Sequence, residues 1–338
     1  GGIKMKTRHC CLMLLSVVSC VGDAFSADTT QADVPAFGAD AAVNVFVHDE
    51  TGNPITNARV RCGFWFKTEE QSPSVFGRTD RTGHFLAKAK CNADVLALVR
   101  HEGFYWSSVR KRFGDTTACP KVVDGKWQPY GAELPVLMRK VVNPIALDRH
   151  SFTRDIPATN QWIGLDMEKG AFVKPFGDGE VQDLEFLFDW DGKVRKQYSG
   201  SALHVRFPGD CAGGYWFDRV KCSDYELAMS ADTNAAYQAE FEFSSTKTAD
   251  GWIEHLFGNE RSLVVRTRCR TDAEKRLRSA MYAQIHSLAF GWGSRGHGWI
   301  RLGYERNPKV NDPNLESDHV VRTMKDIERK MDWLPSVK

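Results

Sequence analysis

Alternation of apolar and polar residues with a period of two is the feature of this sequence that most restricts its fold. Between residues 41 and 140, short runs place apolar side chains on one face and polar side chains on the other. The apolar positions are Val43, Val45 and Val47, then Ala58, Val60, Cys62, Phe64 and Phe66. Neighbouring side chains of a β-strand point to opposite sides of the sheet, so this period is typical of half-buried strands. The chain is therefore expected to fold as sheets.

Turn residues separate these runs and account for the acidic residues beside them. The stretch that starts at His48 continues with Asp49, Glu50, Gly52 and Pro54. Glycine tolerates a positive φ and proline fixes φ, which are both properties of a turn. We interpret His48 as the end of a strand and the two acids as loop residues, in preference to a metal or acid–base site.

Three short motifs occupy turn and core positions of this half. They are Asp49, Gly52, Pro54, Ile55, Asn57, Ala58 and Val60, then Thr79, Asp80, Gly83 and Phe85, then Val99, Gly103, Phe104 and Tyr105. Together they resemble the carboxypeptidase regulatory-like domain. The resemblance covers residues 41–140 and implies a seven-stranded, transthyretin-like β-sandwich of the kind attached to secreted bacterial proteins, with no catalytic residue. The segment Gly114–Tyr130 is longer than the usual loop of that family.

A second β-rich unit is predicted at residues 161–310, after a weakly patterned linker at 141–160. Its apolar positions are Leu184, Phe186 and Phe188, then Leu203, Val205 and Phe207, then Tyr237, Ala239, Phe241 and Phe243. Further runs lie at 263–269, 280–290 and 299–304. This pattern of strands and glycine-rich turns predicts another sandwich or a jelly roll. No family is recognised for this half.

The tail, residues 311–338, changes to a helical period. Val320, Met324, Ile327 and Met331 are separated by four, three and four residues, which predicts one amphipathic helix. We expect this helix to pack on the second sandwich, with partner binding as the alternative. The predicted fold class is all-β, with two β-sandwich domains in tandem and a short C-terminal helix.

Residues 1–27 have the pattern of a secretory signal peptide, and residues 28–40 that of a linker. Lys4, Lys6 and Arg8 precede an apolar run, which is followed by small residues. The run is too short to span a bilayer. Val17–Cys20 also resembles a bacterial lipobox, in which Cys20 would be lipidated. We favour a secreted or periplasmic protein over an outer-membrane lipoprotein, which would touch the membrane only through that lipid.

The cysteines outside the leader number six, and export to an oxidising space favours disulfides among them. They are Cys62, Cys91, Cys119, Cys211, Cys222 and Cys269. Cys62 and Cys91 both fall in core-facing rows, and we favour a Cys62–Cys91 disulfide over two buried free thiols. No CxxC motif occurs, which argues against a zinc knuckle or a redox dithiol.

Several stretches resemble motifs for catalysis or metal binding, but each lacks a residue or a structural context that the motif requires. His101-Glu102 is followed by Tyr105 where a zinc-protease helix needs histidine. Gly291–Gly296 has the spacing GxGxxG but precedes a strand-like run, so we interpret it as a hairpin loop. Asp189–Gly192 lacks the further ligands of a calcium loop, and the elbow GxSxG is absent. We therefore predict no catalytic residue, no metal site and no cofactor.

Aromatic residues beside glycines give the strongest remaining binding signal. Tyr215, Trp216, Trp292 and Trp299 are candidates for stacking on a glycan, although burial is the commoner fate of tryptophan. The charge of 45 basic against 43 acidic residues argues against nucleic acid as a partner, because such binders carry a basic excess.

The sequence thus favours an exported, non-catalytic protein that binds or displays something at the bacterial cell envelope, with a glycan or an envelope protein as its partner. The rival hypothesis is a secreted hydrolase with its active site in residues 161–310, using acids or histidines such as His204, His255 or His286. A third hypothesis is a structural envelope lipoprotein.

Overall fold

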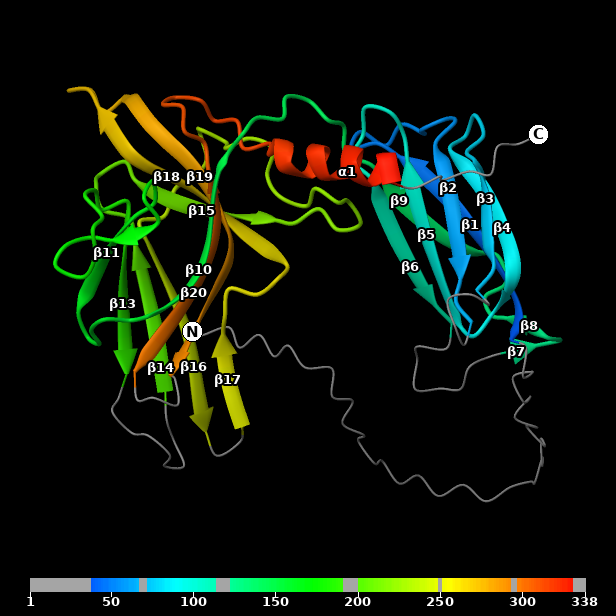
Figure 1. The fold of residues 1–338 in the computed structure, drawn as a ribbon, viewed down its shortest axis with the longest axis horizontal. Helices are drawn as coiled ribbons and strands as arrows, with labels where there is room; N and C mark the ends of the chain where they lie inside the picture. The colour runs from blue at the N-terminus through cyan, green and yellow to red at the C-terminus, as the bar shows by residue number, and fades with distance from the viewer. Residues whose placement is uncertain are drawn as a thin grey trace, which may run out of the picture. The chain divides into compact units, whose positions relative to one another are not determined.

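The computed structural model describes residues 38–66, 72–113, 122–190, 200–248, 251–292 and 297–330, and these belong to one unit, Val34–Lys338. Within the described residues the chain forms twenty strands and one helix (Figure 1), which confirms the all-β prediction. The predicted signal peptide, Cys20, Cys119 and Met331 lie outside the described residues.

The first nine strands form two sheets. They are β1 (Ala39–His48), β2 (Arg59–Phe64), β3 (Ser74–Arg78), β4 (His84–Cys91), β5 (Asp94–Arg100), β6 (Ser107–Arg112), β7 (Val122–Val123), β8 (Lys126–Trp127) and β9 (Ala132–Leu137). One sheet has the order β4-β1-β8-β7, with β9 also paired to β1, and the other has the order β3-β2-β5-β6. The predicted faces of β1 and β2 are buried: Val43, Val45, Val60, Cys62 and Phe64 expose 2% or less of their surface.

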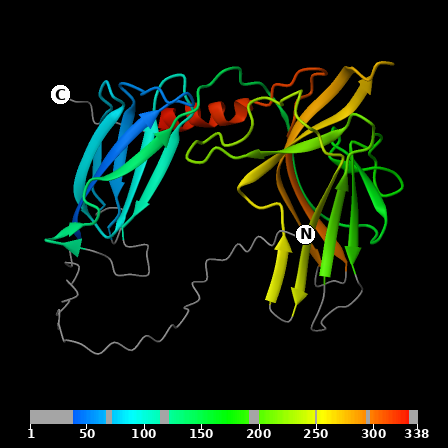
Figure 2. The ribbon, with the colours of Figure 1, turned by 180° about the vertical axis from the view of Figure 1, so that it is seen from behind.

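The next eleven strands form two further sheets. They are β10 (Asp148–Asp155), β11 (Trp162–Asp166), β12 (Ala171–Phe172), β13 (Leu184–Trp190), β14 (Gly200–Arg206), β15 (Gly213–Asp218), β16 (Glu240–Thr248), β17 (Gly251–His255), β18 (Arg261–Thr271), β19 (Leu277–Trp292) and β20 (Gly298–Arg306). Their orders are β10-β20-β19-β18-β15 and β12-β11-β13-β14-β16-β17. Residues from both sheets share one buried cluster, including Phe186, Phe188, Leu203, Ile285 and Tyr304. Figure 2 shows β18, β19 and β20 from the other side, as long yellow and orange strands.

The acidic turns that precede β2 and β4 are built alike. The Asp49 Oδ1 atom accepts hydrogen bonds from the backbone and hydroxyl of Thr51 and from the backbone of Asn53. Asp80 Oδ1 accepts the same set from Thr82 and the His84 backbone. Each carboxylate therefore stabilises its own turn, as expected from the sequence.

The predicted Cys62–Cys91 disulfide is wrong. Both cysteines are free and buried in the core of the first two sheets, where they pack as small apolar side chains. Among the described cysteines, a disulfide joins Cys211 and Cys269 instead, 58 residues apart in the sequence. Cys211 lies in a loop and Cys269 lies in β18, so period-two patterning gave no indication of their pairing. Cys222 is a free thiol of intermediate exposure.

Helix α1 (Asp318–Lys330) forms where the change of period predicts it. Its apolar side chains Val320, Met324 and Ile327 join a cluster with Tyr105 and Tyr225. The sequence suggested that this helix packs on the second sandwich. The structure differs, because Tyr105 follows β5 and so belongs to the first half of the chain. No helix in the described part of the chain is long and apolar enough to cross a membrane.

Candidate functional site

Tyr215 and Trp216, the aromatic candidates of β15, pack in different hydrophobic clusters. The Trp216 ring lies 5.1 Å from Phe257 and 5.7 Å from Phe241 between centroids, within the core of the second pair of sheets. Tyr215 packs in a separate cluster, and its hydroxyl accepts a hydrogen bond of 2.8 Å from the Asp232 backbone. These two side chains therefore pack in different clusters, and they do not form one flat surface on which a sugar could stack.

Trp292 and Trp299 flank the hairpin between β19 and β20. Their register partners are Gly298 and Gly291 respectively, which places the two indoles on opposite faces of the sheet. Trp292 stacks on Trp190, with ring centroids 3.6 Å apart. Sugar stacking by either residue stays a prediction, but the four aromatic candidates do not form one site.

Among the candidate histidines, His204 lies on β14, with its Nδ1 atom 3.8 Å from Glu242 Oε2. His255 is exposed at the end of β17, whereas His286 lies on β19 in the other sheet. Among the residues that the structure describes, no group of three or more His, Cys, Asp or Glu side chains is placed to hold a metal ion.

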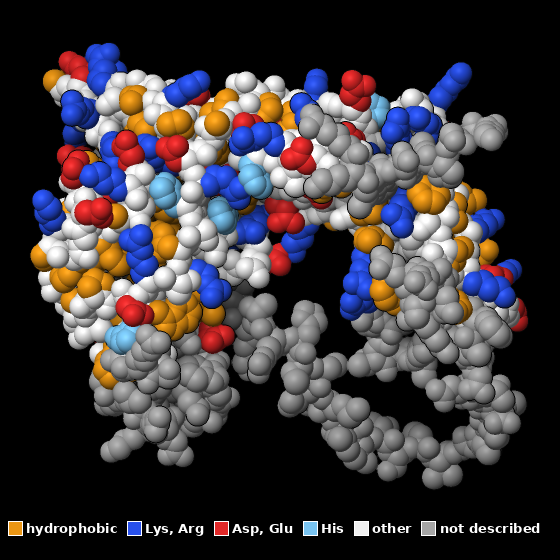
Figure 3. Space-filling model, in the orientation of Figure 1, with side chains coloured by type: hydrophobic (Ala, Val, Ile, Leu, Met, Phe, Trp, Pro, Cys, Tyr) orange, Lys and Arg blue, Asp and Glu red, His pale blue; other side chains and the backbone are white. Residues whose placement is uncertain are grey.

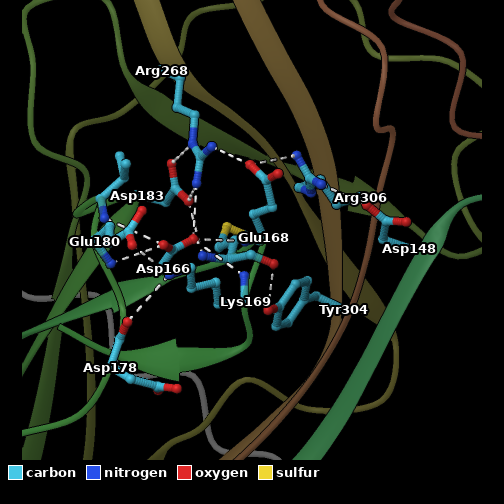
Figure 4. Close-up of polar contacts among 12 residues, drawn as sticks. Asp148, Asp166, Glu168, Lys169, Asp178, Glu180, Asp183, Arg268, Tyr304 and Arg306 are labelled. Carbon is cyan, nitrogen blue, oxygen red and sulfur yellow. Dashed lines mark hydrogen bonds and ion pairs between the residues drawn. The ribbon is translucent and has the colours of Figure 1, made fainter.

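A network of carboxylates surrounds Arg268 in the second pair of sheets (Figure 4). The Arg268 Nη2 atom lies 2.8 Å from Asp166 Oδ1, and its Nε atom lies 2.8 Å from Asp183 Oδ1; the same guanidinium also bonds Glu168. Arg268 has a φ of 47° where the register of β18 and β19 shifts, an irregularity that redirects its side chain. The side chains of Asp166 and Asp183 are 3% and 0% exposed.

The bonding of this network indicates a structural role. Burial raises the pKa of Asp166, but backbone amides of Glu180, Lys169, Val181 and Glu168 outweigh it and hold that pKa below its usual value. The Asp183 Oδ2 atom accepts from the Met167 backbone at 2.8 Å. Because the buried oxygens are already occupied, they are poorly placed to act on a ligand.

A cavity of about 620 Å³ is lined by residues of β6, β10, β19, β20 and α1 and of the segment after β15. We call it the Glu305 cavity. It is lined by Ser108, Val109, Arg110, Arg149, Arg219, Cys222, Ser223, Asp224, Glu226, Leu227, His286, Glu305 and Val320. This volume is within the range of small-molecule sites, about 300–1,000 Å³.

Glu305 is the buried charged residue of this cavity. It exposes 5% of its surface and is the register partner of Arg149 on β10 and of Gln284 on β19. Its Oε1 atom lies 2.7 Å from Arg149 Nε, whereas its Oε2 atom has no hydrogen-bond partner among the described residues. The Gln284 Oε1 atom, also buried, is likewise unpaired there. Burial raises the pKa of Glu305, and Arg149 and Gln284 oppose that shift.

His286 adds a neutral ring to the same cavity. Burial lowers its pKa to about 4, and the positive charges of Arg219 and Arg149 act in the same direction. A Cβ atom at Gly303 would lie 2.7 Å from the ring Cε1 atom, so glycine at that position leaves room for the imidazole. At neutral pH the ring therefore carries one donor and one acceptor nitrogen.

Asp224 and Cys222 line the cavity from the segment after β15. Burial raises the pKa of the Cys222 thiol, with Glu226 adding to the shift, so the reactive thiolate is disfavoured. Burial also raises the pKa of Asp224, partly offset by Arg100, although the residue remains exposed to solvent. The cavity thus combines donors, acceptors and one buried carboxylate, which suits recognition of a polar ligand.

Sequence reasoning named His286 but missed Glu305 and Arg149. Glu305 lies in a run whose polar residues are expected to face solvent, and nothing in that run indicates that its neighbours bury it. The cavity is lined by segments that lie far apart in the sequence, from Ser108 in β6 to Val320 in α1. Gly303 gave a weak signal, because a glycine inside a strand often marks a close approach.

Comparisons with known proteins give no family for this chain. No protein-family model and no curated protein matches it. A solved structure of 3-chlorocatechol 1,2-dioxygenase from Rhodococcus opacus 1CP matches at 11% identity and a TM-score of 0.25, covering 31% of this chain and 61% of that chain. A putative carbohydrate binding protein from Bacteroides uniformis ATCC 8492 matches at 9% identity and a TM-score of 0.18, covering 81% of this chain and 100% of that one. At these TM-scores, neither likeness carries an argument about function.

Proposed function

We propose that the protein is an exported, non-catalytic binding module of the bacterial cell envelope, which holds a hydroxyl-rich ligand such as a glycan in the Glu305 cavity. The observation that carries the proposal is the polar lining of the Glu305 cavity, where the arginines Arg149 and Arg219 lie beside the carboxylates Glu305 and Glu226. A ligand that enters the cavity therefore meets both donors and acceptors.

The lining of the cavity favours a polar ligand without strong net charge. Arg149 and Arg219 supply donors, Glu305 and Glu226 supply acceptors, and the His286 ring supplies one of each. A hydroxyl group both donates and accepts, so neighbouring hydroxyls of a sugar match such alternating partners. The apolar side chains of Val109, Leu227 and Val320 would contact the carbon atoms of the ring.

Export is supported by the covalent chemistry of the chain. The Cys211–Cys269 disulfide is typical of an oxidising compartment. Together with the signal-peptide pattern of residues 1–27, it supports secretion or a periplasmic location, with lipidation of Cys20 as the alternative. In this proposal the regulatory-like sandwich of residues 41–140 acts as a rigid spacer, and residues 141–160 as the linker to the second domain.

Calorimetric titration of the purified protein with a panel of neutral oligosaccharides tests the binding proposal. We expect at least one member to bind, and Glu305→Gln to weaken that binding about tenfold, because it removes a charged acceptor while keeping the shape of the side chain. The matched control is Glu242→Gln, an exposed glutamate of β16 with a side chain 62% exposed, which should leave affinity unchanged. Binding that is equal in both variants, or a panel with no ligand, would contradict the proposal.

The rival hydrolase is favoured by one observation, the raised pKa of Glu305 in a cavity that also contains Asp224. A glutamate with a raised pKa is better suited to donate a proton to a leaving group, with a second carboxylate as its partner. Incubation with the same oligosaccharides separates the two hypotheses. Turnover that is abolished in both Glu305→Gln and Asp224→Asn would replace the binding proposal, whereas binding without turnover would support it.

A further inference from the structure

Three arginines lie side by side across three consecutive strands of the β3-β2-β5-β6 sheet. Arg59 of β2 is the register partner of both Arg78 of β3 and Arg100 of β5. Register partners point to the same face, here the face opposite to the buried Val60 and Cys62. Neighbouring strands are about 4.8 Å apart, and like charges directly opposite each other destabilise a sheet. We call Arg78, Arg59 and Arg100 the arginine ladder.

The whole sheet carries an excess of positive charge. Its four strands contain seven basic residues, which are Arg59, Arg61, Arg78, Arg100, Arg110, Lys111 and Arg112, and one acidic residue, Asp94. Asp94 is already engaged, because Arg110 binds both of its carboxylate oxygens. Within the described part of the chain, no ion pair joins Arg59. The excess is local, because the full chain has a net charge of only +2, and Figure 3 shows acidic and basic side chains intermixed over the second half.

Two rungs of the ladder are held in place by neighbouring groups. The Arg100 guanidinium carbon lies 3.2 Å from the centroid of the Trp106 ring, and the residue exposes 7% of its surface. Arg78 donates to the Asn57 carbonyl at 3.2 Å and to the Asn57 side-chain oxygen at 3.1 Å. Side chains that are fixed before binding lose less conformational entropy when a ligand arrives.

The ladder faces a hollow of about 930 Å³. Its charged lining consists of Arg59, Arg78, Arg100, Lys325, Glu102 and Glu328, with His101 beside them. Phe104 and Trp106 contribute aromatic surface, and Val321 and Met324 of α1 contribute apolar surface. The hollow is therefore more basic than the Glu305 cavity and of a size for a discrete group.

We propose that the arginine ladder is a binding site for an oxyanion group, namely a phosphate, sulfate or carboxylate carried by a soluble ligand or an acidic glycan. Guanidinium groups present planar forks of N–H donors that match such oxyanions, often with two bonds each. An anion between the rungs would offset the repulsion between Arg59 and the two arginines that it faces. A flat bilayer or a duplex is a poorer fit, because Arg100 is buried in a hollow partly lined by α1. This site is separate from the Glu305 cavity, so either proposal can fail while the other stands.

The test uses the full chain and compares Arg59→Gln with Arg112→Gln, a matched loss of one charge on the same sheet. The Arg112 side chain is 56% exposed and does not line the hollow. Titration calorimetry would use inorganic phosphate, inorganic sulfate and oligogalacturonate at low ionic strength. Co-sedimentation with phosphatidylglycerol vesicles and binding of labelled duplex DNA would form the other arms. Circular dichroism and thermal unfolding would confirm that both variants fold.

We expect phosphate, sulfate or oligogalacturonate to bind, and Arg59→Gln to weaken that binding about tenfold, whereas Arg112→Gln changes it less than twofold. Binding should also weaken as salt is added, because the interaction is between charges. The proposal is overturned if none of the three anions binds, or if both variants lose affinity equally, which would indicate a diffuse charge effect. Tighter binding to vesicles or DNA that depends on Arg59 would replace the proposed ligand class.

Discussion

Arg59 in the first pair of sheets and Arg268 in the second face opposite electrostatic surroundings. Arg268 is held by Asp166, Asp183 and Glu168, which raise its pKa, with the Asp183 hydrogen bond as the largest cause. Arg59 faces Arg78 and Arg100. The difference shows that an arginine on a strand can stabilise the fold where it pairs with carboxylates and destabilise the sheet where it faces other arginines. Four measurements test this difference.

The largest effect is expected from Arg268→Met. The substitution leaves two carboxylates, Asp166 and Asp183, buried without their cation, which should lower the free energy of unfolding by about 3–5 kcal/mol. Urea denaturation measures this change. The control is Arg276→Met, whose side chain is 67% exposed and should contribute less than about 1 kcal/mol. Equal losses in the two variants would show that the network around Arg268 is not a structural centre.

The sulfur chemistry of the two halves gives the second contrast. Replacing Cys211 and Cys269 together by alanine should lower the free energy of unfolding by about 2–4 kcal/mol, because the open chain gains conformational entropy when it unfolds. Cys62→Val, a free and buried thiol in the first half, should cost less than about 1.5 kcal/mol. Denaturation with and without reductant measures both effects. A reductant that destabilises the Cys211/Cys269 variant as much as the native chain would contradict this assignment.

The third contrast concerns acid. The folded protein keeps His286 neutral down to about pH 4, whereas an unfolded histidine is protonated below about 6.5. The stabilising contribution is therefore complete above pH 6.5 and is lost as the pH falls toward 4. We expect the native chain to lose about 2–3 kcal/mol over this range from this residue, and His286→Gln to reduce that loss. Urea denaturation at pH 7, 5.5 and 4.5 checks the slope, and an identical slope in the variant would rule out His286 as its source.

The smallest effect has the opposite sign. Arg59→Gln removes the central charge of the arginine ladder and should raise the free energy of unfolding by about 0.2–1 kcal/mol, because facing cations destabilise a sheet. The comparison with Arg112→Gln, which removes a charge beside Asp94, should show no gain. A lower melting temperature for Arg59→Gln would mean that the ladder is compensated by contacts of its own.

Much of the fold could be predicted because local patterning specifies strands. The alternation at Val43, Val60, Phe186 and Leu203 placed these side chains in the two cores correctly. The strand predicted around Tyr237 begins later, at Glu240, because alternation alone does not fix where hydrogen-bonded pairing starts.

The Cys211–Cys269 pairing and the neighbours of α1 could not be predicted, since both depend on how distant segments meet. Neither of the two sites was indicated by local sequence. In the local pattern, Glu305 and Arg59 are ordinary strand residues. Their electrostatic surroundings depend on register partners in other strands. The net charge of +2 gave no indication of the arginine ladder, because a sum over the chain does not show where the basic residues lie. The packing of Trp216 and Trp292 against the core of the second pair of sheets likewise depends on distant neighbours.

Helix α1 contributes adjacent residues to two different hollows, since Val320 lines the Glu305 cavity and Val321 lines the one beside the arginine ladder. A shift of this one element on occupancy of either hollow would alter the other. Thermodynamic linkage then requires the effect to be reciprocal: a sugar that tightens phosphate binding by some factor must have its own affinity raised by the same factor. Helix α1 would in that case couple the two binding sites. Titrating each ligand in the presence and absence of the other would measure the coupling free energy.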